Sequence, residues 1–339
     1  MLPAPPSDGG RSGIAGRVRS IVIGEGDRMS ARRAEIWDSD EVGWFADDEP
    51  IRRVHADSAM LIGALRALLL QSLHPRAMAG VAQHSDYRHD PWGRIQRTAD
   101  FLAATTFGPV VEAERAVERV RRVHERVVGT TAEGRPYAAN DPHLLRWVHV
   151  AEVDSFLAAH DRYGAEPLVG AERDRYVENA AVVAGALGAA DAPRSARELR
   201  SQLHAYRREL RSTPEARDGA RYLLITPPIG LIGRAPYGVL AAAAVSLLPT
   251  WARWPLRLPW LPVSERLVVR PAGDALTRTL RWALTADPPW RSKPGLRGHV
   301  RGGGGGCPSR GGRGRGRVGR RGRPGPSAAR GRGPAPRAG

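Results

Sequence analysis

Apolar residues recur at helical spacing along most of the chain. Between residues 30 and 290, Ala, Leu and Val return every three or four positions, with Arg and Glu between them. This spacing is typical of amphipathic helices. Alternating runs of β-branched residues, which would indicate strands, are scarce. The pattern therefore predicts an all-α fold, with a single compact multi-helix domain over residues 30–290.

Helix-starting and helix-ending residues divide this domain. Asp90-Pro91 and Asp141-Pro142 each place a capping carboxylate before a proline at the first helical position. Glycines stop several of the apolar-periodic segments. We expect a loop or short hairpin at 130–139 and a segment too rich in proline for a regular helix at 249–262. The predicted helices cover residues 58–73, 91–106, 110–128, 142–163, 170–187, 195–211, 213–225, 235–248 and 263–285.

Two segments, 56–73 and 229–248, are apolar enough to raise the question of a membrane. Each carries an arginine, Arg66 or Arg234, and a central arginine costs about 2.5–3.5 kcal/mol on insertion scales. We therefore interpret both as buried core helices.

Three tryptophans in the proline-rich segment, Trp251, Trp254 and Trp260, are expected either to pack over the helices or to contact a membrane surface. Residues 1–29 contain several Pro and Gly and no continuous apolar run, so they show no secretory signal. We expect a flexible segment there and a cytoplasmic protein, with peripheral membrane contact as an alternative.

The net charge of +17 is concentrated at the C-terminus. Of the 52 Lys and Arg residues, 14 lie in residues 291–339, which hold no Asp or Glu, so residues 1–290 carry 38 basic residues against 35 acidic ones. The tail, 291–339, consists largely of Arg-Gly repeats and cannot bury apolar surface, so it is predicted to be disordered. Three interpretations stay open for it: the product of a shifted reading frame, inert disorder, or binding to RNA or an anionic surface.

Cysteine usage excludes several kinds of site. The single cysteine, Cys307, lies in the tail. The domain therefore has no intrachain disulfide, no thiolate-bound metal or haem, and no cysteine nucleophile. A metal in the domain has to be held by His, a carboxylate or Tyr.

His149 lies in the middle of an apolar helical stripe. In the predicted helix 142–163 it shares a face with Leu145, Val153, Phe156 and His160. A buried imidazole needs partners for its nitrogens. Spacing alone leaves two readings: a core histidine that is hydrogen-bonded to the protein, and a ligand to a metal or haem.

Arg94 and Thr98 lie one turn apart on the otherwise apolar face of the helix 91–106. They could serve an anionic cofactor group or bound oxygen. The alternative is an arginine that reaches the surface and a threonine that bonds back to its own helix. In the preceding segment, His74-Pro75 is expected at a helix end facing a pocket, and His84 and His89 in a solvated turn. The spacing of these three histidines matches no standard metal motif.

Three sequence blocks, taken in this order, resemble the MpaB-type oxygenase family, which groups fungal MpaB with the latex-clearing rubber oxygenases. They are H-P at 74–75, G-R-x-x-R-T at 93–98 and D-P-x-L-L-x-W-V-H at 141–149. The resemblance covers about residues 30–290.

The resemblance implies a helical fold that encloses a b-type haem, and an oxygenase that acts with O2 on an unidentified apolar substrate such as an alkene. The proximal iron ligand of that family corresponds to His149. The Arg and Thr near its haem correspond to Arg94 and Thr98, with Arg97 where some relatives have lysine. Arg94, Arg97 and Arg146 are candidates to pair with the haem propionates. The distal acidic base proposed for rubber oxygenases has no counterpart that can be placed in this sequence, so the resemblance does not extend to the base of rubber-type alkene cleavage.

Two other classes of function compete with this reading. A di-iron site requires Glu-x-x-His pairs on two helices and two further Glu, whereas the chain offers His149-Val-Ala-Glu152 in the reverse order and no second copy. A non-enzymatic protein could bind nucleic acid through the Arg/Gly tail, although the last aromatic residue of the chain is Trp290.

Overall fold

The computed structural model of the chain describes residues 41–85, 90–227 and 230–285. The segment predicted to be flexible, 1–29, and the tail predicted to be disordered, 291–339, lie outside the described residues, as does His89.

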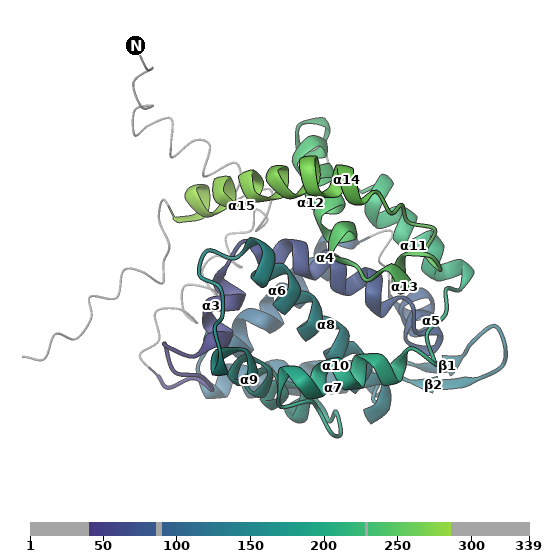
Figure 1. Ribbon diagram of the computed structural model, residues 1–339. Helices are drawn as coiled ribbons and strands as arrows, with labels where there is room; N and C mark the ends of the chain where they lie inside the picture. Colours follow the sequence, from purple (N-terminus) through teal and green to yellow (C-terminus); the bar gives the residue numbers. More distant parts are fainter. Residues whose placement is uncertain (1–40, 86–89, 228–229, 286–339) are drawn as a thin grey trace, which may run out of the picture. The chain divides into compact units, whose positions relative to one another are not determined.

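The described chain is mostly helical, which confirms the all-α prediction (Figure 1). The predicted hairpin is also present: β1, Val128–Thr130, pairs antiparallel with β2, Pro136–Ala138. The helices are α3 Pro50–Ala56, α4 Ala59–Gln71, α5 Pro75–His84, α6 Pro91–Phe107, α7 Val110–His124, α8 Pro142–Tyr163, α9 Ala171–Leu187, α10 Ala196–Tyr206, α11 Pro214–Ile225, α12 Leu231–Leu247, α13 Thr250–Arg253, α14 Pro262–Ser264, the π-helix η1 Glu265–Val269, and α15 Arg270–Thr285.

Both Asp-Pro pairs start helices as predicted. The Asp90 carboxylate accepts a hydrogen bond from the backbone N–H of Gly93 at 2.9 Å, at the start of α6. The Asp141 carboxylate accepts one from the N–H of His143, also at 2.9 Å, at the start of α8. Each side chain thus satisfies a donor that the first helical turn leaves without a backbone partner. The Asp141 cap fixes where α8 begins, and therefore which face of that helix carries His149.

The segment after His74 differs from the prediction. His84 is not in a turn: it is the last residue of α5, and its ring lies 3.1 Å from the Tyr137 hydroxyl. Pro75 supplies the fixed backbone angle suited to a first helical residue, and Met78, on the same helix, is buried in the core. The helix predicted to reach residue 128 ends at His124, because residues 128–130 pair in the hairpin instead.

Helices α4 and α8 pack against each other along their length at the centre of the domain (Figure 1). Gly63 lies in this contact: a Cβ there would approach 2.8 Å to Cδ1 of Phe156 and 3.2 Å to Cβ of Ala159. Trp147, fully buried on α8, donates its indole N–H to the carbonyl of Gln71 at 3.2 Å. A small residue on one helix and large ones on the other thus bring the two backbones close.

Both apolar segments belong to packed helices, as expected. The Arg66 side chain is only 4% exposed and bonds Asp154 and Ser155 of α8. On α12, Ala243 and Ala244 are fully buried against α4 and its neighbours. Within the described ranges, no helix combines the length and the apolar character needed to cross a membrane.

Replacing Gly63 with alanine should destabilise the fold by about 1–3 kcal/mol, because the added methyl overlaps the backbone and ring of Phe156. The matched control is Gly185→Ala on α9, where nothing lies within 4 Å of the new Cβ. That variant should be stabilised by about 0.5–1 kcal/mol through helix propensity. The free energy of unfolding of both variants, measured in urea, checks this. Equal changes in stability for the two variants would contradict the close packing of α4 against α8.

The three tryptophans of the proline-rich segment have different surroundings. Trp251 packs against the core, with the Arg207 guanidinium 5.2 Å from the centre of its ring. Trp254 and Trp260 are instead 82% and 61% exposed. Of these three tryptophans, therefore, Trp251 packs over the helices as expected, and the other two do not.

Candidate functional site

His149 lies on the apolar face that the sequence predicted for α8. Leu145, Val153 and Phe156 on this face are each less than a tenth exposed. Burial lowers the pKa of His149 to about 4, so its imidazole is neutral near pH 7. A neutral imidazole is the form that coordinates metals.

The Nε2 atom of His149 is buried and has no hydrogen-bond partner among the described residues. A buried nitrogen without a partner costs free energy, of the order of 1–3 kcal/mol. Such atoms in a folded protein call for an explanation, and a bound ligand is one. Nε2 of His149 is therefore a candidate ligand atom.

Glu152 lies one turn further along the same face of α8. Burial raises the pKa of its carboxyl to about 7. Burial and the nearby Glu152 carboxylate raise the pKa of Tyr176 on α9. The buried hydroxyl of Tyr176 also has no hydrogen-bond partner among the described residues. His149 and Glu152 are both deeply enclosed, yet each side chain keeps some accessible surface.

A further histidine, His55 of α3, faces the same region. Its ring lies edge-on to Phe156 at 5.4 Å and to Tyr176 at 6.0 Å between ring centres. Its Nδ1 lies 2.8 Å from the Thr106 hydroxyl, and burial lowers its pKa to about 3. Sequence analysis missed this contact and the burial of Glu152, because both depend on which helices pack against α8.

The buried Glu152 carboxyl should make stability depend on pH. Its ordinary pKa is 4.5 and its folded value about 7, so between these values the unfolded chain releases a proton that the folded protein keeps. Stability therefore falls as pH rises from about 4.5 to about 7, and stays lower above that. At about pH 8, Glu152→Gln should be more stable than the wild type by about 1–3 kcal/mol.

Urea unfolding at about pH 8 and about pH 4 measures this effect. The two proteins should differ little at the lower pH, where the Glu152 carboxyl is neutral in both states. The control is Glu166→Gln, at an exposed position, which should match the wild type at both pH values. A Glu152→Gln protein that gained nothing at the higher pH would show that the carboxyl is solvated.

The three predicted residues of α6 lie near one another. Arg94, which is partly buried, donates to the Ser85 hydroxyl at 2.9 Å. Thr98 is exposed and donates to the carbonyl of Arg94 at 3.1 Å, the back-bonding that was its alternative reading. Arg97 is exposed and forms an ion pair with Asp90 at 3.1 Å.

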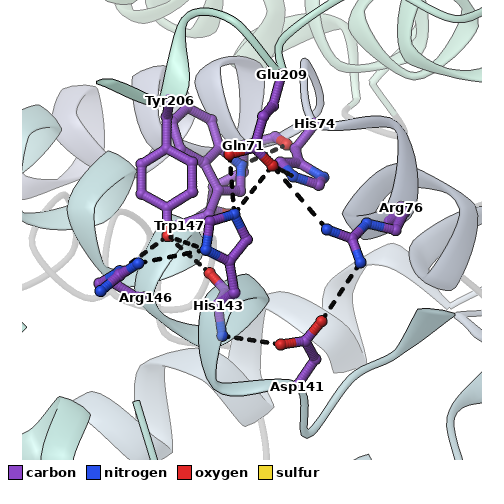
Figure 2. Close-up of polar contacts among 9 residues, drawn as sticks. All are labelled: Gln71, His74, Arg76, Asp141, His143, Arg146, Trp147, Tyr206 and Glu209. Carbon is purple, nitrogen blue, oxygen red and sulfur yellow. Dashed lines mark hydrogen bonds and ion pairs between the residues drawn. The ribbon is translucent and has the colours of Figure 1, made fainter. Parts of the chain in front are cut away.

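Arg146 is held away from His149, although it lies on the same helix. Its guanidinium donates to the Tyr206 hydroxyl at 3.0 Å and forms an ion pair with Asp191 at 3.3 Å (Figure 2 shows the contact with Tyr206). Its side chain therefore points toward the end of α10 and the loop before that helix.

His160 is a second buried histidine of the α8 face. Neither of its ring nitrogens has a partner among the described residues. Its ring lies against the chain at the end of its own helix, since a Cβ on Gly164 would come within 2.9 Å of Nε2. Gly164 thus lies close beside Nε2 of His160, which makes this nitrogen a poorer ligand candidate than Nε2 of His149.

A separate polar cluster lies at the start of α8 (Figure 2). Nε2 of His143 lies 2.9 Å from both carboxylate oxygens of Glu209, and Nε2 of His74 lies 3.4 Å from one of them. His74 is 2% exposed, at the N-cap of α5, as its expected place at a helix end suggested. The sequence did not reveal the cluster, because its members come from three distant segments.

The comparisons with known proteins identify the family. The family model described as "ER-bound oxygenase mpaB/B'/Rubber oxygenase, catalytic domain" matches residues 52–282, more than half of the chain. The chain belongs to this family. The match to the MpaB/rubber oxygenase catalytic domain includes His149 and every other predicted site residue. The family's description makes the domain an oxygenase, hence an oxidoreductase. No curated protein and no solved structure matches the chain significantly.

Proposed function

We propose that this protein is a haem b-dependent oxygenase in which Nε2 of His149 would hold the haem iron. The observation that carries the proposal is the neutral imidazole of His149, whose buried Nε2 lacks a partner among the described residues. Haem ligation by one imidazole suits such a group. The residues present therefore fit a haem, and the family match supports an oxygenase.

When bound, the haem would supply the reactivity toward O2, and the protein supplies orientation and shielding from water. Leu145, Val153 and Phe156 surround His149 with apolar surface, which keeps water from the ligand nitrogen. The same apolar surface favours an apolar substrate, such as an alkene, over a charged one.

The polar residues have separate roles in this proposal. Arg94, partly buried, and Arg97 are the candidates to pair with the haem propionates. Arg146 is a weaker candidate, because Asp191 and Tyr206 already engage its guanidinium. The Thr98 hydroxyl donates its hydrogen to the Arg94 carbonyl of its own helix. Its oxygen could therefore only accept a hydrogen bond from a substrate. Glu152, with a pKa of about 7, can hold or release a proton one turn from His149.

An absorption spectrum of the purified full-length protein tests the haem assignment. We expect a Soret band in the protein as isolated, which shifts after reduction with dithionite and again after addition of CO. A folded protein without a Soret band, produced with ample haem, would overturn the assignment. Iron without porphyrin would instead support the non-haem di-iron alternative.

A further inference from the structure

We propose that His74, His143 and Glu209 form a second metal site, for a divalent transition-metal ion, with Zn²⁺ the best fit. His74 lies at the N-cap of α5, His143 in the first turn of α8, and Glu209 in the segment between α10 and α11 (Figure 2). A metal here would link three parts of the domain. It would be distinct from the haem iron proposed at His149.

The spacing of the ligand atoms suits a tetrahedral ion. Bonds of about 2.0–2.2 Å from Zn²⁺ to nitrogen and oxygen place neighbouring ligand atoms about 3.3 Å apart. The Glu209 carboxylate lies 2.9 Å from Nε2 of His143 and 3.4 Å from Nε2 of His74. All three ligand atoms lie within 4.8 Å of one another. Small rotations of the side chains would therefore complete the geometry.

The donor set selects the class of ion. Two imidazoles and one carboxylate suit Zn²⁺ and its transition-metal neighbours, whereas Mg²⁺ and Ca²⁺ prefer oxygen ligands alone. The His143 and Glu209 side chains are 35% and 39% exposed, so an ion can enter from solvent. Three protein ligands leave the fourth position of the ion to water.

A bound ion would require the other tautomer of His143, with the proton moved from Nε2 to Nδ1. The Arg146 guanidinium, which can only donate, lies 3.3 Å from Nδ1 of His143. Without metal, Nε2 therefore carries the proton and donates it to Glu209. With metal on Nε2, Nδ1 can carry the proton and donate to the Tyr206 hydroxyl at 3.5 Å. The nearby Arg76 is shared between Glu209 at 4.0 Å and Asp141 at 3.5 Å.

Calorimetric titration of the full-length protein with ZnCl₂ tests the site. We expect binding at this site in the wild type, and at least a tenfold loss of affinity in both Glu209→Gln and His143→Gln. The matched control is His204→Gln, an exposed histidine on α10, which should bind as the wild type does. Absence of binding, or binding that neither variant weakens, would overturn the proposal. An unchanged Soret band in Glu209→Gln would separate this site from the one at His149.

We also infer that the exposed surface of residues 254–270 binds anionic membrane surfaces. Six large apolar side chains in this stretch are more than half exposed: Trp254, Trp260, Leu261, Val263, Leu267 and Val268. Arg257, Arg266 and Arg270 are exposed among them. The acid in the stretch, Glu265, is engaged by Arg253, which is only 4% exposed.

This composition points to a lipid surface as the occupant. Exposed tryptophans favour the membrane interface, and arginines are drawn to anionic headgroups. Arg257, Arg266 and Arg270 form no ion pair with a carboxylate of the described residues. Their positive charges are therefore available to lipid headgroups. A stretch of exposed apolar side chains interspersed with exposed arginines matches the composition of interfacial segments.

Flotation with vesicles of phosphatidylglycerol and phosphatidylcholine tests this inference. All proteins are compared at the same moderate salt, because the Arg-rich residues 291–339 are common to them and contribute equally to binding. We expect Leu267→Ser/Val268→Ser to reduce the bound fraction at least threefold. The matched control is Val123→Ser/Val182→Ser, two exposed valines on α7 and α9, which should bind like the wild type. Equal binding of both double variants, or no binding of the wild type, would overturn it.

Discussion

Replacing His149 with alanine should reduce the haem content by at least tenfold and leave the helical fold in place. The imidazole is the proposed bond between protein and iron, so its loss removes the principal anchor of the cofactor. The fold should persist because Nε2 makes no hydrogen bond within the described residues. Haem per chain, measured as the pyridine haemochrome, and the far-ultraviolet circular dichroism spectrum report the two properties separately.

His160→Ala is the matched control for this loss. It removes a second buried imidazole from the same face of α8, whose nitrogens also lack partners among the described residues. Because Gly164 lies close beside Nε2 of this ring, the variant should keep its haem per folded chain. A loss of haem in His160→Ala with full retention in His149→Ala would move the ligand to the other histidine.

Replacing Arg66 with methionine should destabilise the protein by about 3–5 kcal/mol, the cost of breaking a buried ion pair by removing one partner. Its guanidinium donates to Asp154 at 2.7 Å, to Ser155 at 2.6 Å and to the Leu247 carbonyl at 3.0 Å. Without it, the largely buried Asp154 carboxylate loses its counter-charge. The free energy of unfolding in urea measures the effect.

An exposed pair supplies the control for Arg66. Arg115 is 65% exposed and pairs with Glu112 at 2.7 Å, so Arg115→Met should cost less than about 1 kcal/mol. Adding Asp154→Leu to Arg66→Met should recover part of the lost stability, because the unpaired carboxylate is then gone. Similar losses for Arg66→Met and Arg115→Met would mean that the buried network does not link α4, α8 and α12 as described.

Local chemistry made the helix starts predictable. Asp90-Pro91 and Asp141-Pro142 set the starts of α6 and α8 through contacts within three residues. The helix ends were harder, because tertiary pairing competes with propensity. The end of α7 at His124 follows from pairing of Val128 with Ala138, which the helical pattern before it does not reveal.

The candidate site was predictable only in part. Periodicity placed His149 on the apolar face of α8, since that depends on one helix alone. It could not show that Nε2 lacks a partner, because the surrounding side chains come from other helices. For the same reason the sequence did not bring His143 to Glu209, which lie 66 positions apart.

The proposed bond between Nε2 of His149 and a haem iron is tested most directly in a His149→Gly variant supplied with imidazole. If His149 is the ligand, added imidazole should restore haem binding, and the iron–nitrogen stretching band in the resonance Raman spectrum of the reduced protein should shift when the imidazole carries ¹⁵N. Full haem binding by the variant without imidazole, with a band that ignores the label, would contradict the assignment.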